Sequence, residues 1–203
     1  ESGYYLLVDG VEEEVVIIYI DENAIDGNLI YKIGAETVLD LDIYGGDVLV
    51  IRDDSGAKMQ VTEIGEAIGS VSDTDLLFSY SSIDMSASSA DLYVYSQTTL
   101  DFNGEDLIMD ASSQVINNGT IQFLGSETLT NVTMDTDSGT VEYTGTGSDL
   151  SIDSTISYYD LKVTGTGTYS LSGNIEATND ILINTGSITL LGATTLKADK
   201  DQE

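Results

Sequence analysis

The chain has 203 residues, of which 41% are apolar, and its 36 acidic residues outnumber six basic ones to give a net charge of −30. The charge argues against nucleic acid and anionic membranes as partners, because binding to phosphates requires clustered Lys and Arg. The sequence contains no Cys and no His, which excludes disulfides, thiol chemistry and the commonest general base. These absences disfavour an enzyme.

The strong acidity has three open interpretations. It can keep the protein soluble through self-repulsion, bind Ca²⁺ through carboxylate oxygens, or suit a salty environment in which repulsion is screened. The longest apolar run, Val15–Ile20, is far shorter than the roughly 20 residues of a membrane-spanning helix, so we expect no membrane insertion. The first residues, 1–3, do not resemble a signal peptide, and we interpret the chain as a mature or excised form.

Residues 1–75 predict a β-meander or sandwich domain, because short apolar runs alternate with turn signals about every 8–12 residues. The first run, Tyr4–Val8, ends at Asp9-Gly10, which is typical of a hairpin turn. The second run, Val15–Ile20, is continuously apolar, as in a central strand buried on both faces.

The same two runs are candidates for a subunit interface, because a strand can be added to the exposed edge of a neighbouring sheet. The predicted interface residues are Tyr4, Tyr5, Leu6, Leu7, Val8, Val15, Val16, Ile17 and Ile18. The first run lies at the terminus and is therefore freer to swing out. The alternative is that Val15–Ile20 is a central strand of its own domain.

Two acidic turns are candidate calcium sites, since hard cations prefer carboxylate and carbonyl oxygens. Asp53 and Asp54 precede Ser55-Gly56, and Asp135 and Asp137 precede Gly139. Calcium is the only cofactor predicted. The alternative is that these are solvated acidic turns, and the sequence contains no EF-hand loop.

Residues 76–99 form a predicted connecting segment and first coil. Glu63–Gly69 before it is the only plausible helical turn, and residues 79–89 are rich in Ser and predict a loop. Asp91–Tyr95 then restores the alternation of a strand.

Residues 100–203 contain a repeat of about 20 residues. Triplets of the pattern apolar-x-apolar begin at Ile121, Val141, Leu161 and Ile181, each 20 residues apart, and Leu100 extends the series upstream. A second apolar column is Leu129, Leu150, Leu171 and Leu191, and a third is Val115, Met134, Ile156, Ile175 and Leu196. Three columns per period predict a right-handed parallel β-solenoid with coils of about 20 residues. An antiparallel meander with hairpins of about 10 residues is the alternative.

Two segments of this repeat, 158–175 and 180–190, resemble repeats of secreted microbial surface proteins of the autotransporter and haemagglutinin-like β-helix kind. The shared pattern is Y-x-L-x-V followed by G-x-Y-x-L-x-G-N-I, and the resemblance covers roughly residues 100–196. It implies a cell-surface or extracellular location and an adhesive or structural role, and it carries no catalytic residues. Those proteins often have many more coils.

Two sequons, at Asn118 and Asn131, are candidate glycosylation sites. The sequence as a whole predicts an all-β structural subunit of an extracellular filament, fibre or surface layer. It would assemble as a homopolymer by edge pairing, since solenoid ends present unpaired backbone groups. A glycan-binding adhesin or virus-fibre module is the alternative, to which exposed members of the 12 tyrosines would contribute. A polysaccharide-active enzyme is a third, less favoured class.

Overall fold

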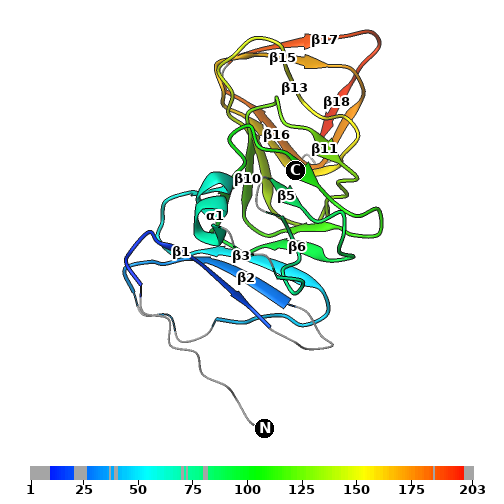
Figure 1. The fold of residues 1–203 in the computed structure, drawn as a ribbon. Coiled ribbons are helices and arrows are strands. Elements are labelled where there is room, and N and C mark those ends of the chain that lie inside the picture. The colour runs from blue at the N-terminus through cyan, green and yellow to red at the C-terminus, as the bar shows by residue number, and fades with distance from the viewer. Residues whose placement is uncertain are drawn as a thin grey trace.

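Parallel strands stack along one axis and form a β-solenoid of about eight turns (Figure 1). The structure is a computed structural model, and it describes residues 10–20, 27–36, 38, 41–69, 71, 73–79, 82–184 and 186–198. The predicted fold class, all-β with a parallel solenoid, is confirmed.

The described elements follow one another in short segments, as the frequent turn signals predict. The first part contains β1 (Val15–Tyr19), β2 (Gly27–Lys32), β3 (Val48–Asp53), β4 (Met59–Gln60), α1 (Val61–Ile68), β5 (Ile83–Asp84), β6 (Asp91–Val94), β7 (Thr99–Asp101), β8 (Leu107–Ile108) and β9 (Val115–Asn117). The second part contains β10 (Thr120–Phe123), β11 (Leu129–Thr130), β12 (Thr140–Tyr143), β13 (Leu150–Ser151), β14 (Tyr158–Val163), β15 (Thr168–Leu171), β16 (Ile175–Ile183), β17 (Ser187–Leu190) and β18 (Leu196–Ala198).

Each coil contributes strands to different faces of the solenoid. One sheet has the order β1-β2-β3-β6-β9, and the longest has the order β18-β16-β14-β12-β10-β7-β4. Two three-stranded sheets, β11-β8-β5 and β13-β15-β17, form the remaining faces. Successive coils therefore pair along the axis, and the longest sheet extends from β4 to β18, whereas the first sheet ends at β9 and the two short sheets lie one after the other.

The predicted 20-residue triplets form one continuous ladder. Ile121 pairs with Val141, Val141 with Leu161, and Leu161 with Ile181, while Leu100 pairs with Ile121 upstream. Their alternation of apolar and polar residues buries one face of each strand in the interior. This column is confirmed in every step.

The other two columns hold only in part. Leu150 pairs with Tyr169 and Leu171 with Leu190, so these leucines belong to two different rows, and Leu129 pairs with Leu107 in another sheet. In the third column, Val115 bridges Met134 and Ile175 pairs with Leu196. Turn lengths differ between coils at these corners, so equal sequence spacing does not preserve the row there.

The strand pairing near the N-terminus differs from the predicted meander. Among the described strands, β1 and β2 form the one antiparallel pair, whereas β2, β3, β6 and β9 are parallel to one another. The solenoid sheet therefore begins at β2, well before residue 100. Corners between solenoid coils use the same Gly and Asp residues as hairpin turns, so turn signals alone do not distinguish the two arrangements.

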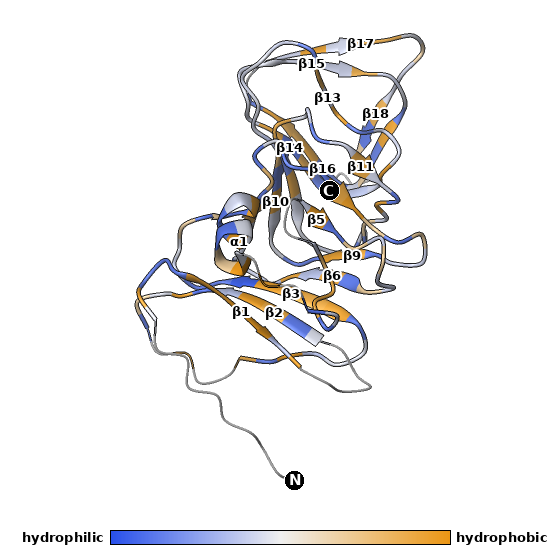
Figure 2. Ribbon diagram, in the orientation of Figure 1, coloured by the Kyte–Doolittle hydropathy of each residue, from blue (hydrophilic) through white to orange (hydrophobic). Residues whose placement is uncertain are grey.

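The interior is a continuous apolar core with an aromatic row at its centre. The rings of Phe102, Phe123, Tyr143 and Tyr169 follow one another from coil to coil, with centroids 4.9–6.1 Å apart. Helix α1 covers part of the first coils through its buried residues Val61, Ile64 and Ile68, and it packs against β1 and β4. Figure 2 shows the resulting alternation of apolar and polar residues along the strands. Within the described ranges, no helix has the length and apolarity needed to span a bilayer.

Candidate functional site

The last coil of the solenoid exposes residues that every earlier coil buries. Three of its apolar side chains are 36–51% exposed, although their register partners one coil earlier are at most 1% exposed. The pairs are Leu190 with Leu171, Ile183 with Val163, and Leu196 with Ile175. Register partners in parallel strands point to the same face of a sheet, so these side chains point inward, and no described strand pairs with them on the other side. We call Ile183, Leu190 and Leu196 the open end.

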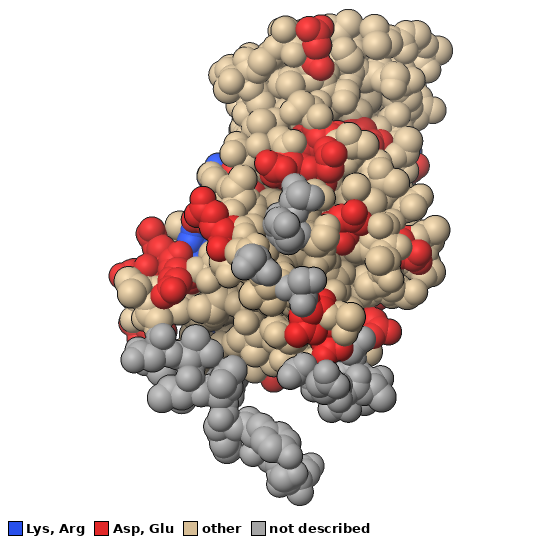
Figure 3. Space-filling view, viewed as in Figure 1, with Lys and Arg blue, Asp and Glu red and all other residues tan. Residues whose placement is uncertain are grey.

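Among the described residues, the coils at the open end also carry little excess charge. Residues 161–198 contain two basic and two acidic residues, whereas residues 1–160 contain 31 acidic and three basic ones. Figure 3 shows acidic atoms over the earlier coils and few over the last ones. A contact made here would bring together far less like charge than a contact elsewhere.

The opposite end of the solenoid is covered. Helix α1 and the hairpin strand β1 lie against the first coils, and α1 is anchored there by an ion pair. Lys32, which is 3% exposed, donates to both carboxylate oxygens of Glu63 at 2.9 Å and to the Lys58 carbonyl at 2.9 Å. Glu63 also accepts a hydrogen bond from the Gln60 N–H and so closes the first turn of α1.

Four of the predicted interface residues, Val15, Val16, Ile17 and Ile18, form most of β1. The strand is half-buried rather than central, because it is the outermost strand of its sheet. Val15 and Ile17 pack on the main core, and Val16 and Ile18 pack on a second apolar cluster around Leu29. Contact on both faces agrees with the continuously apolar run. The other predicted interface segment, Tyr4, Tyr5, Leu6, Leu7 and Val8, lies outside the described residues.

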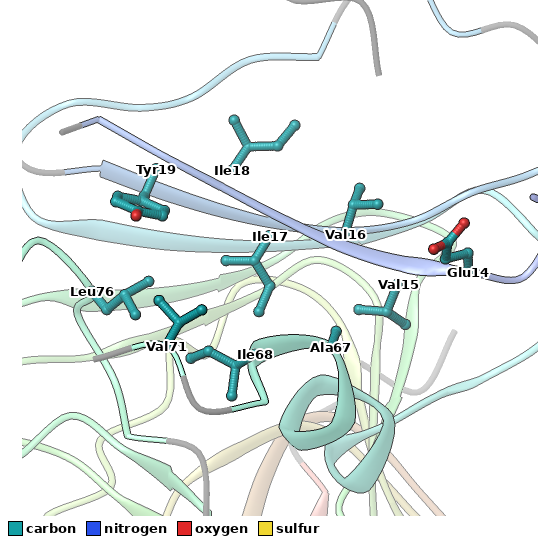
Figure 4. Close-up of a pocket in the computed structure, with 10 residues that line it drawn as sticks. All are labelled: Glu14, Val15, Val16, Ile17, Ile18, Tyr19, Ala67, Ile68, Val71 and Leu76. Carbon is teal, nitrogen blue, oxygen red and sulfur yellow. The ribbon is translucent and has the colours of Figure 1, made fainter. Parts of the chain in front are cut away.

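A hollow of about 560 Å³ follows the outer side of β1 (Figure 4). It is lined by every residue from Glu14 to Tyr19 and, across from them, by Ala67, Ile68, Val71 and Leu76. In Figure 4, Val15 and Ile17 point toward α1, whereas Ile18 points away from it. The Val15–Ile20 run signals this site in the sequence, but Ile68, Val71 and Leu76 carry no recognisable pattern.

The first predicted calcium pair does not converge. The Asp54 carboxylate binds the Arg52 guanidinium, with N–O distances of 2.9–3.1 Å. Asp53 is 5% exposed, and its Oδ1 accepts hydrogen bonds from the N–H and the hydroxyl of Ser55. Over the part of the chain that the structure describes, no group of three acidic side chains is placed to hold a metal ion. Calcium at Asp53 and Asp54 remains a prediction without a preformed site.

The second pair, Asp135 and Asp137, does come together. Burial and the neighbouring Asp137 carboxylate raise the pKa of Asp135, in spite of the hydrogen bond that Asp135 accepts from the Asn117 N–H at 2.9 Å. Two carboxylates in contact can share a proton or bind a cation. Two protein ligands alone do not define a calcium site, which takes about 6–8 oxygens.

Both sequon asparagines lie on the surface and are hydrogen-bonded. The Asn118 amide donates to the Tyr93 hydroxyl at 2.7 Å, and the Asn131 amide donates to the Met109 carbonyl at 3.3 Å. Glycosylation at either position remains a prediction.

Three tyrosines form a row on the outer face of the first sheet. The ring centroids of Tyr44 and Tyr93 are 6.0 Å apart, and those of Tyr93 and Tyr95 are 6.2 Å apart. The Arg52 guanidinium lies 4.8 Å from the centroid of Tyr95. Tyr44 is the most exposed of the three, so the row offers aromatic surface to solvent. We call these three residues the tyrosine row.

Taken together, these features define an all-β solenoid with one covered end and one open end. Comparisons with protein-family models, curated proteins and solved structures found no match, so the fold and its surfaces carry the functional argument.

Proposed function

We propose that the chain is a structural subunit, not an enzyme, and that it joins a second copy end to end through the open end of its solenoid. The observation that carries the proposal is the exposure of Ile183, Leu190 and Leu196, whose register partners are buried. Stacking another coil would bury this surface and pair the outer backbone groups of β17 and β18.

Charge favours a second copy that presents its own open end. Residues 161–198 carry no net charge, while 31 of the 36 acidic residues lie in residues 1–160. Joining two open ends keeps the acidic parts at the far ends of the pair, where their repulsion is smallest. A two-fold contact of this kind uses the same surface on both copies, which is the commonest symmetry in protein assemblies.

The covered end supports the same arrangement. Helix α1 and strand β1 occupy the first coils, so a head-to-tail contact would meet a surface that is already packed. An end-to-end pair of this kind is closed, so the predicted filament, fibre or surface layer would be built from such pairs through a further contact on another surface. The cell-surface setting is proposed from the sequence resemblance in residues 158–190.

Sedimentation equilibrium tests the proposal. We expect the wild type to dimerise, and added salt to strengthen the dimer because it screens the remaining repulsion. Leu190→Lys and Ile183→Lys should each weaken dimerisation at least about tenfold, since each buries an unpaired charge. Val11→Lys, at a 73% exposed residue outside the open end, adds the same charge as a control and should have no effect.

A wild type that stays monomeric at high protein concentration would overturn the proposal, and so would a Val11→Lys variant that dissociates as readily as Leu190→Lys. The calcium prediction is separable. Ca²⁺ should strengthen association more than Mg²⁺ does at the same ionic strength. Equal effects of the two ions would mean that they act by screening charge and that no specific calcium site contributes.

The tyrosine row supports glycan binding as a second candidate function. Three rings in sequence offer flat, partly exposed surface with hydroxyls, and Arg52 and Asn118 border them with polar groups. Tyr44→Ala should abolish a glycan-array signal, and Tyr159→Ala, on a strand of another sheet, should preserve it. A signal that survives Tyr44→Ala would exclude the row as the binding surface.

A further inference from the structure

Strand β1 lies at one edge of the first sheet within the part of the chain that the structure describes. It pairs with β2 on one side, and it ends the strand order of the sheet among the described residues. An edge strand presents a row of free N–H and C=O groups, onto which another extended segment can add. The free edge alone does not identify a partner.

The hollow beside β1 has the form that an added strand requires. It follows the whole strand from Glu14 to Tyr19, and it borders residues from both faces of the strand. Side chains of a strand placed next to β1 would alternate, and those on the α1 side would enter the space in front of Ile68 and Val71 (Figure 4). This space is apolar, so it fits aliphatic side chains.

Acidic groups lie at both ends of the hollow. Three exposed acidic residues, Glu12, Glu13 and Glu14, precede β1, and Glu14 also lines the hollow. At the other end the Tyr19 hydroxyl donates to Asp73 at 3.3 Å. The nearby Lys32 is buried and bound to Glu63, so it does not offset these charges at the surface. The surface is therefore apolar in the middle and negative at its ends.

We infer that this edge binds an extended apolar segment of another protein that carries Lys or Arg on both flanks, by adding it as a strand beside β1. Main-chain hydrogen bonds would supply affinity, and the hollow and the flanking acids would select the sequence. Charge disfavours a second copy of β1 in this place, because Glu12–Glu14 and Asp21-Glu22 flank that strand. The inference is independent of the contact at the open end.

Peptide titrations by fluorescence anisotropy test each part of the inference. The probe is a labelled peptide with the sequence Lys-Lys-Val-Thr-Val-Thr-Val-Lys-Lys. We expect it to bind, and we expect the same peptide with Gln in place of every Lys to bind at least about tenfold more weakly. A Lys-flanked peptide with N-methylated valines keeps the charge but cannot complete the ladder, and it should also bind about tenfold more weakly.

Two protein variants locate the binding site. Val71→Lys places a charge in the hollow and should weaken binding at least about tenfold. Leu182→Lys is the matched control, because it adds the same charge to a side chain of β16 with similar exposure, 46% against 48%, that lines neither the hollow nor the open end. It should bind the probe as the wild type does, and circular dichroism should show that both variants are folded.

Four outcomes would overturn the inference. Equal binding of the N-methylated peptide would show that charge alone attracts the probe, and equal binding of the Gln-flanked peptide would show that the acids select nothing. Equal affinities of Val71→Lys and Leu182→Lys would place the peptide elsewhere. If Val71→Lys instead converts a dimer of the wild type into monomers, a second copy occupies the edge, and the inference is wrong.

Discussion

The first and last described coils of this solenoid differ in how their inward-facing apolar side chains are covered. Every coil must cover the apolar residues of its neighbour. At the first coils, α1 and β1 cover these residues. An ion pair between Glu63 of α1 and the buried Lys32 of β2 joins the helix to the solenoid. At the last described coil Ile183, Leu190 and Leu196 are exposed, in a part of the chain, residues 161–198, that has two acidic and two basic residues. Among the described residues, the first coils are therefore covered by a helix and a strand, whereas the coil that contains β17 and β18 exposes apolar side chains, which is the basis of the proposed contact.

The largest expected effect compares two leucines in the same row. Leu171 and Leu190 are register partners, with exposures of 0% and 51%. Leu171→Ala removes a fully buried side chain and should cost about 2–5 kcal/mol, whereas Leu190→Ala should cost less than about 1 kcal/mol in the monomer. Urea unfolding at low protein concentration measures both. Equal losses would mean that the last coil is covered in solution, which would break the comparison.

The second prediction compares an ion pair at each end. Glu63→Ala leaves the buried Lys32 ammonium without its carboxylate and should cost about 3 kcal/mol. Glu176→Ala removes the partner of Lys197, where both side chains are more than half exposed, and should cost less than about 0.5 kcal/mol. Chemical denaturation of both variants measures the difference. A small loss for Glu63→Ala would mean that α1 is not tied to the first coils by this pair.

The third prediction uses two glycines with left-handed backbone. Gly139 has φ of 73°, and a Cβ there would lie 2.1 Å from the Asn117 carbonyl oxygen of the coil below. Gly192 has φ of 83°, and a Cβ there would meet nothing within 4 Å. The left-handed backbone should lower the free energy of unfolding of both alanine variants by about 1 kcal/mol. The clash should lower that of Gly139→Ala by a further ~1–3 kcal/mol. Thermal unfolding should therefore rank Gly139→Ala as clearly less stable, and equal stabilities would show that the last turn is packed.

The comparison also shows how far the sequence predicts such a fold. The triplets from Ile121 to Ile181 were predictable because a strand with one buried face alternates strictly, and their ladder is continuous. The row that contains Leu150 was not predictable, because the turns at that corner differ in length. Leu150 therefore pairs with Tyr169 and not with the leucine that the repeat predicts. The helical turn near Glu63 was predicted correctly within α1.

The functional surfaces were less predictable than the fold, for a physical reason. In sequence Leu190 has the same pattern as Leu171, and only the structure shows that Leu171 is buried and Leu190 is exposed. Likewise, parallel pairing of β2 with β3 could not be inferred from turn residues that hairpins also use. The hollow beside β1 depends on Val71 and Leu76, which reach it through the tertiary fold alone.

The smallest expected effect concerns the acidic coils themselves. Burial, and then the neighbouring Asp137, raise the pKa of Asp135, so the folded protein holds this proton more tightly than the unfolded chain does. Ionised Asp135 therefore destabilises the fold above its raised pKa, and the penalty disappears as the pH falls to the ordinary value of 3.8. Asp135→Asn keeps an acceptor for the Asn117 N–H and should stabilise the protein at pH 7 by less than about 1 kcal/mol.

Asp110 provides a control of opposite sign for the same measurement. Hydrogen bonds from the hydroxyl and the N–H of Ser112 lower the pKa of Asp110, so its ionised form favours the folded state. Asp110→Asn should therefore destabilise the protein at pH 7, and the loss should shrink as the pH falls through the lowered pKa. Urea unfolding of both variants in a series from pH 7 downward would show the two trends. A destabilising Asp135→Asn would mean that the carboxylate pair carries no penalty, and a bound cation would then be the simplest reason for keeping two acids in contact on a chain that already carries excess negative charge.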